Sequence, residues 1–332
     1  MTRRRSQWTA TVAVLCTSAV LICSCGGAGP PSANAPRTTT STPPPATAPP
    51  STAVPSSTAP TAPGPAASGP YWLIEDFTLS LLEHNGLPAA TITELFNSPR
   101  TLLIVRPHGN APDALVPLAQ KVESFASFTA MQTSILDATI EPGVKYVLYD
   151  NEAWASTPSD EKAAPFTFAA QALALAHAHG LQMIFTPAAN LTPILDPSYT
   201  ASNQLSSGRG KFSGYLNLNM AGQGAATSDV VEIQGQQAED EPGFTSFVAQ
   251  AAAQARAAAP THLVLLGITT SIPGSGPVNP ATLTSVVAAT RSLVSGYWLN
   301  IPGQSPQCPN CGQADAGPAV TFLESYAAGS GQ

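Results

Sequence analysis

The chain has 332 residues, of which only 10% are charged, and its formal net charge at pH 7 is −7. The charge is unevenly placed, because residues 71–332 hold nine basic residues against all twenty acidic ones, a net charge of −11. Such an acidic domain repels phosphate backbones and anionic lipid surfaces. We therefore expect no nucleic acid among the partners of this protein.

Residues 1–25 have the layout of a secretory signal peptide. Three arginines precede an apolar stretch over residues 12–22, and small residues then surround two cysteines. The segment ICSCG resembles a bacterial lipobox, which implies cleavage before Cys25 and attachment of a lipid to it. We expect this lipid to hold the protein on the outer face of the cell membrane. The alternatives are a secreted protein cut further along the chain and a retained anchor helix.

Residues 26–70 are expected to form a disordered spacer between the lipid and a folded domain. They contain 13 prolines, many Thr, Ser and Ala residues, and a single charged residue, Arg37. A segment with so little apolar surface cannot offset the entropy lost on folding. The remaining residues, 71–332, are then predicted to form one domain.

Two cysteines of this domain, Cys308 and Cys311, stand close together in the sequence CPNC. In an oxidising compartment we expect them to form a disulfide that fixes the loop after the last strand. A zinc site would need further ligands, and no group of His, Cys and acidic residues has the spacing of a metal site. The domain also lacks a glycine-rich phosphate-binding fingerprint, so we expect no metal and no cofactor.

Apolar strands and helices alternate along the domain. The expected helices are 161–179, which Gly180 ends, 243–258, and 280–294, which begins with Asn279 and Pro280. The expected strands are 72–76, 102–106, 126–131, 145–149, 183–187, 230–234, 263–268 and 296–301, with 214–219 as an alternative to 72–76. Helices that separate strands apolar on both faces indicate a parallel sheet. We therefore predict a (β/α)8 barrel of the TIM type, in which the first strands are either regular or incomplete and irregular.

Polar side chains gather where the predicted strands end. Side chains alternate along a strand, so Asp150 and Glu152 share a face with Tyr146 and Leu148. We expect this face to point into the barrel, which places both acids at the carboxyl-terminal rim, where barrel enzymes hold their catalytic residues. Glu232 is expected to reach the same rim from a later strand.

Amides, two tryptophans and basic groups are predicted to accompany these acids as ligand-binding residues. The candidates are Arg106, His108, Asn151, Trp154, Gln234, Gln236, Trp298 and Asn300. Such a combination is typical of a sugar site, because rings stack on aromatic side chains, amides bind hydroxyls and acids exchange protons. Structural explanations compete with these roles. Asp150 is suited to cap a helix or pair with Arg106, and Glu232 to be a structural acid within the barrel.

The segment YDNE resembles two patterns of glycoside hydrolases. Asn151 and Glu152 match the Asn-Glu pair at the fourth strand of the large retaining-glycosidase clan, whereas Asp150 and Glu152 match the terminal Asp-x-Glu of family-18 chitinases. Later segments, over roughly residues 140–302, resemble the later strands of the chitinase-like barrel, where Trp298 would form the floor of the sugar site. Both patterns imply that Glu152 is the proton donor. The lipobox, spacer and Ala-rich helices also resemble secreted lipoproteins of actinobacterial type.

We therefore expect a membrane-tethered, extracytoplasmic glycosidase that acts on a glycan. Glu152 is the expected general acid, Glu232 the second carboxylate, and Asp150 the neighbour that raises the pKa of the acid. The main alternative is a non-catalytic lipoprotein that binds a carbohydrate or another small polar solute on the same barrel. A third hypothesis is a structural envelope protein, which predicts that the carboxyl-terminal rim of the barrel has no cleft.

Overall fold

The computed structural model describes residues 69–106, 114–272, 276–305 and 313–330. Cys25, His108, Cys308 and Cys311 lie outside these ranges, so the lipid site, the histidine and the disulfide stay predictions. Within the described ranges, no helix has both the length and the apolar character needed to cross a bilayer.

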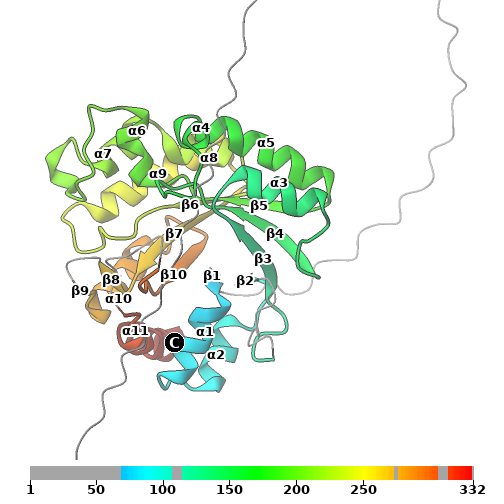
Figure 1. Ribbon diagram of the computed structural model, residues 1–332. Helices are drawn as coiled ribbons and strands as arrows, with labels where there is room; N and C mark the ends of the chain where they lie inside the picture. The colour runs from blue at the N-terminus through cyan, green and yellow to red at the C-terminus, as the bar shows by residue number, and fades with distance from the viewer. Residues whose placement is uncertain (1–68, 107–113, 273–275, 306–312, 331–332) are drawn as a thin grey trace, which may run out of the picture. The chain divides into compact units, whose positions relative to one another are not determined.

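Eight parallel strands form a closed barrel with helices outside it (Figure 1). In order around the barrel, the strands are β1 (Tyr71–Glu75), β10 (Gly296–Asn300), β7 (Leu263–Thr269), β6 (Val230–Ile233), β5 (Gln182–Phe185), β4 (Val144–Tyr149), β3 (Gln120–Phe125) and β2 (Thr101–Val105). Pairing of β1 with β10, in which Trp72 is aligned with Tyr297, closes the sheet. The predicted (β/α)8 barrel is confirmed, and its one irregularity among these pairings is a register shift at Lys121 and Val122.

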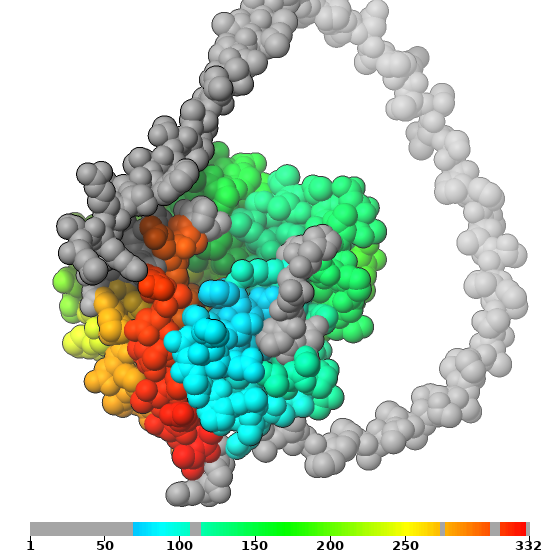
Figure 2. Space-filling model, turned by 60° about the horizontal axis from the view of Figure 1, so that its bottom comes forward, coloured from blue at the N-terminus to red at the C-terminus, as the bar shows by residue number. Residues whose placement is uncertain are grey.

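Short helices connect the strands on the outer surface. They are α1 (Asp76–His84), α2 (Ala89–Phe96), α3 (Phe128–Leu136), α4 (Ser159–Ala163), α5 (Pro165–Ala178), η1 (Ala189–Leu191), α6 (Thr192–Leu195), η2 (Leu205–Ser207), α7 (Lys211–Asn217), α8 (Met220–Ala226), α9 (Phe244–Ala258), α10 (Pro280–Thr290) and α11 (Gly317–Ser330). A two-stranded hairpin, β8 (Ser271–Ile272) and β9 (Gly276–Pro277), follows β7. Figure 2 shows α11 beside α1 and α2, where the rings of Trp72 and Tyr326 meet edge to face at 5.6 Å.

The prediction of a strand at 126–131 is wrong, because Ser127 begins a helix there. Its hydroxyl accepts a hydrogen bond from the Ala130 amide at 3.1 Å, which caps α3. The third strand lies just before it, at 120–125, where the charged residues Lys121 and Glu123 interrupt the apolar pattern. The alternative strand at 214–219 is also wrong, since most of it is helical.

The predicted helices agree with the structure except at their ends. The helix expected over 161–179 is divided at Ala164 into α4 and α5, and Gly180, with φ of 72°, ends the second of these. The helix expected over 280–294 ends earlier, at Thr290. The strand expected at 72–76 is present as β1.

The barrel interior holds a closed apolar layer to which every strand contributes. Its residues are Leu73, Leu102, Ile104, Val122, Tyr146, Leu148, Ile184, Val230, Leu265 and Trp298. Alternation places the next inward position two residues further along each strand. Those positions are Glu75, Arg106, Ser124, Asp150, Thr186, Glu232, Gly267 and Asn300. We call these eight residues the polar layer; it follows the apolar core at the carboxyl-terminal ends of the strands.

Gly267 makes room within the polar layer. A Cβ atom at this position would collide with the side chains of Glu232 and Gln236. The missing side chain therefore allows two polar groups of the β6 segment to lie inside the barrel.

Buried Glu161 of α4 ties β4 to the start of α3. Its carboxylate accepts hydrogen bonds from the amides of Phe128 at 2.6 Å and Thr129 at 3.2 Å, and from the Tyr149 hydroxyl at 2.8 Å. The two amides belong to the first turn of α3, where no helical carbonyl can accept from them. One carboxylate thus satisfies donors from two elements that flank the site.

Replacing Glu161 with Ala should lower the free energy of unfolding by about 2–4 kcal/mol, because several buried donors lose a charged acceptor together. Urea denaturation of the purified protein measures this change. The matched control is Asp160→Ala at the exposed neighbouring position, which should change the value by less than about 0.5 kcal/mol. Equal effects of the two substitutions would contradict the role assigned to Glu161.

Candidate functional site

A cavity of about 1150 Å³ opens at the carboxyl-terminal ends of the strands. Its lining includes most of the residues predicted for the site: Arg106, Asp150, Glu152, Trp154, Gln234, Gln236, Trp298 and Asn300. This end of a (β/α)8 barrel is where such folds build their active sites, and the volume is ample for a small ligand. The hypothesis of a structural envelope protein predicted a rim without a cleft, and the presence of this cavity disagrees with it.

The structure places two of the predicted residues, Asn151 and Glu232, away from the cavity surface. Asn151 is fully buried on the outer face of β4, and its amide donates to the Tyr149 hydroxyl at 2.7 Å and the Glu161 carbonyl at 3.0 Å. Glu232 points inward but has no exposed surface. Neither residue therefore reaches a ligand in the cavity. This corrects the expectation that Glu232 faces the same cleft as Glu152.

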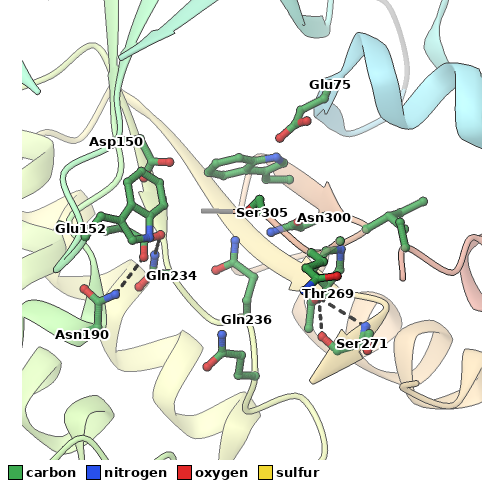
Figure 3. A pocket seen from close by; sticks show the side chains of 18 of the residues that line it. Glu75, Asp150, Glu152, Asn190, Gln234, Gln236, Thr269, Ser271, Asn300 and Ser305 are labelled. Carbon is green, nitrogen blue, oxygen red and sulfur yellow. Dashed lines mark hydrogen bonds between the residues drawn. The ribbon is translucent and has the colours of Figure 1, made fainter. Parts of the chain in front are cut away.

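Glu152 is held in the cavity wall by two side-chain amides (Figure 3). Its Oε2 accepts a hydrogen bond from Asn190 Nδ2, and its Oε1 accepts one from Gln234 Nε2, both at 2.8 Å. The amide oxygens are fixed in turn, because Asn190 accepts from the Ala153 amide at 3.0 Å and Gln234 from the Ala189 amide at 2.7 Å. Each amide group must then present its NH2 to Glu152. We call Asn190 and Gln234 the amide clamp.

Asp150 lies one inward position before Glu152, in the polar layer, and is only 7% exposed. Its Oδ1 accepts a hydrogen bond from the Thr186 hydroxyl at 2.7 Å. Burial raises the pKa of Asp150 well above its ordinary value, and the charge of Glu152 raises it further. Both effects favour the protonated form of Asp150.

Burial also raises the pKa of Glu152, but several neighbours oppose this effect. The Asn190 amide, the charge of Lys211 and the Gln234 amide all favour the ionised form. The sequence suggested that Asp150 would raise the pKa of Glu152. In the structure, the charge of Glu152 raises the pKa of Asp150, which accepts one side-chain hydrogen bond where Glu152 accepts two.

Glu75, at the end of β1, faces Asp150 and Glu152 from across the cavity (Figure 3). Burial raises its pKa, whereas Arg106, whose Nη2 lies 3.9 Å from Glu75 Oε2, opposes the rise. Arg106 also lies 3.7 Å from Asp76, so its ion pairs are not with Asp150. Glu75 was not among the predicted site residues, although the segment WLIED has the same pattern as the Asp150 segment, an apolar run that ends in acids.

Asn190 and Lys211 were also missed, for a different reason. Both come from the long segment between β5 and β6, which consists of short helices and turns. Neither strand alternation nor helical periodicity applies along such a segment. Only the folded chain shows that these side chains reach the cavity.

The cavity wall contains buried polar atoms without a hydrogen-bond partner among the described residues. Gln236 Oε1 offers an acceptor and Trp298 Nε1 a donor. Buried polar groups are normally satisfied by protein, water or a ligand. Because both atoms are themselves buried, they border the cavity without offering accessible surface to a ligand. The described part of the chain holds no group of three or more His, Cys, Asp and Glu residues arranged for a metal ion.

Removing either half of the amide clamp should raise the pKa of Glu152, because each amide stabilises the ionised carboxylate. The variants are Asn190→Ala and Gln234→Leu, and a carbon-detected NMR titration of labelled glutamate side chains measures the shift. Gln250→Leu, at an exposed position on α9, is the matched control and should leave the titration of Glu152 unchanged. An unchanged titration in both clamp variants would exclude this role.

Glu239 follows β6 and lies behind the cavity wall. Its carboxylate accepts a hydrogen bond from the Thr269 amide at 2.6 Å, and burial raises its pKa to about 7. Between the ordinary value of 4.5 and about 7, the folded protein holds a proton that the unfolded chain releases. The free energy of unfolding should consequently fall as the pH rises through this range.

Glu239→Gln should reduce this loss of stability, since the neutral amide does not ionise. Urea denaturation at pH 5 and pH 8 provides the comparison, with Glu94→Gln on the exposed side of α2 as the control. A wild-type protein that is equally stable at the two pH values, or a Glu239→Gln protein with the full wild-type pH dependence, would refute the prediction.

Comparison with known proteins assigns this chain to no family. The sequence matches no protein-family model, and no curated protein sequence is similar to it. Among solved structures, active domain 2 of a thermostable chitinase from Pyrococcus furiosus is 14% identical, with a TM-score of 0.43, and the alignment covers 80% of this chain and 98% of that one. The PgaB (BpsB) glycoside hydrolase domain from Bordetella bronchiseptica is 10% identical, with a TM-score of 0.43 and coverage of 70% and 93%. A sugar phosphate isomerase/epimerase from Parabacteroides distasonis is 12% identical, with a TM-score of 0.43 and coverage of 80% and 98%.

Proposed function

We propose that this protein is a glycosidase-like enzyme that hydrolyses a glycan by carboxylate acid–base catalysis in the cavity. The observation that carries the proposal is the position of Glu152, fixed by the amide clamp at the cavity surface with Asp150 beneath it. A general acid must be oriented toward the leaving oxygen and must have a proton available at working pH. The clamp supports the first requirement, and burial, which raises the pKa of Glu152, supports the second.

In this proposal, Glu152 transfers a proton to the glycosidic oxygen as the bond from that oxygen to the anomeric carbon breaks. A water molecule attacks the anomeric carbon, and its proton passes to a second carboxylate. We assign that role to Glu75 in place of Glu232, because Glu75 lies on the opposite wall and Arg106 favours its ionised form.

The remaining lining residues suit the binding of sugar rings and hydroxyls. Trp154 and Trp298 offer apolar ring surfaces, and Gln236 and Asn300 offer amide groups. The proposed partner is therefore a glycan, held without a cofactor. The lipobox at Cys25 and the proline-rich spacer support a position on the outer face of the membrane, reached through the lipid anchor only.

The alternative is a carbohydrate-binding protein without catalysis. The specific observation in its favour is that both oxygens of Glu152 already accept hydrogen bonds from the clamp. A carboxylate satisfied in this way suits the positioning of a ligand as well as proton transfer, and the fold does not separate the two functions.

Glu152→Gln should abolish turnover, with a loss of about 10²- to 10⁴-fold, because the amide keeps the shape but cannot donate the proton. Product release from a panel of oligosaccharides measures turnover, and the midpoint of thermal unfolding shows whether the variant is folded. Glu75→Gln should also lose turnover, whereas Glu324→Gln, on the exposed side of α11, should not.

Two results would count against catalysis. Turnover that survives in a folded Glu152→Gln protein would remove the proposed acid. Saturable binding of a glycan by the wild-type protein, with no product and no change in affinity on Glu152→Gln, would establish the binding alternative.

A further inference from the structure

Lys211 is a buried cation in the cavity wall. It is the first residue of α7, its exposure is only 8%, and it lines the cavity on the side formed by the segment between β5 and β6. Its amide donates to the Ser202 carbonyl at 3.0 Å. The preceding Gly210 packs so closely that a Cβ there would lie 2.7 Å from the carbonyl oxygens of Ser202 and Gln204. The backbone therefore fixes where this side chain starts.

The ammonium group of Lys211 is positioned by one neutral partner. Its Nζ donates to Gln237 Oε1 at 3.2 Å. Gln237 has a φ of 78°, a conformation that is costly for a residue other than glycine and that is concentrated at functional sites. The Asn203 amide donates to the Gln237 carbonyl at 3.4 Å, so this strained residue is held from a second side.

No carboxylate of the described residues lies within ion-pair distance of the Lys211 ammonium. Glu152 and Glu239 are close enough to raise the pKa of Lys211, but neither forms an ion pair with it. An ammonium has three hydrogens to donate, and within the described part of the chain only Gln237 accepts one. Arg106, by contrast, has Glu75 and Asp76 beside it. A buried cation is normally paired, so Lys211 retains capacity for an anionic partner.

We propose that Lys211, with Gln237 and Asn203, forms a subsite for a carboxylate group carried by the glycan. This inference rests on the proposed function and names the class of its substrate, an acidic saccharide. The charge balance of the cavity favours a single negative charge, because Glu75, Asp150 and Glu152 line the same space and disfavour a dianion such as a phosphate monoester. The carboxylate belongs either to a uronic acid or to a lactyl ether on an amino sugar.

Calorimetric titration of the full-length protein in detergent tests the subsite with matched saccharides. The probes are a hyaluronan tetrasaccharide, which carries uronic acids, its carboxyl-reduced neutral counterpart, and the disaccharide of N-acetylglucosamine and N-acetylmuramic acid, which carries a lactyl group. The wild-type protein should bind at least one acidic probe about tenfold to a hundredfold more tightly than the neutral one, as expected for a buried hydrogen bond between charged groups. The stronger of the two acidic probes identifies the source of the carboxylate.

Lys211→Met should abolish the preference for the acidic probe and leave the affinity for the neutral probe unchanged. Methionine has a similar length and no charge, and Lys211→Arg should retain part of the preference. The matched control is Lys145→Met, an exposed lysine at the start of β4, which should retain all of it. Thermal unfolding verifies that each variant is folded.

The possible failures are distinguishable. Equal binding of acidic and neutral probes by the wild-type protein, or equal weakening of both by Lys211→Met, would overturn the subsite and leave the proposed function standing. A Lys211→Met protein that keeps the preference and only shifts the pH dependence of turnover would show that the lysine acts on Glu152 instead. Binding of no saccharide would overturn the subsite together with the proposed function.

Discussion

Closure of the parallel sheet between β1 and β10 determines which side chains can meet inside this protein. In a closed barrel, every second residue of each strand points to the axis, and these residues must fill a narrow interior. The apolar layer from Leu73 to Trp298 forms one buried cluster in this interior, and the polar layer follows it toward the carboxyl-terminal ends of the strands. The cavity lies where the inward positions change from apolar to polar residues near the carboxyl-terminal end of each strand.

The amide clamp shows how that closed scaffold supports chemistry. Glu152 follows β4, Asn190 follows β5 and Gln234 follows β6, so three consecutive strands of the barrel deliver one carboxylate and its two donors. Lys211 reaches the same cavity from the segment between β5 and β6, and its ammonium donates to Gln237 without an ionic contact among the described residues. The proposed acid and the proposed carboxylate subsite therefore lie on the same part of the barrel rim.

Much of the fold was predictable because the strands are buried on both faces and the helices are rich in alanine and leucine. The strand β3 was not, since Lys121 and Glu123 conceal its apolar residues and Ser127 directly begins a helix. At the site, alternation correctly placed Asp150 and Trp298 on the inward face. Alternation could not show that Glu232 lies below the cavity surface. The depth of a residue along the barrel axis depends on how neighbouring strands are staggered.

The sequence by itself determined most of the strands, the parallel barrel and the acids at the end of β4, because these follow from hydrophobic periodicity and from alternation within a strand. Only the tertiary structure decided that Glu75 faces Glu152 and that Lys211 reaches the cavity. The physical reason is that these contacts join residues far apart in the chain. Their distances are fixed by barrel closure and by irregular segments, which leave no periodic signal in the sequence.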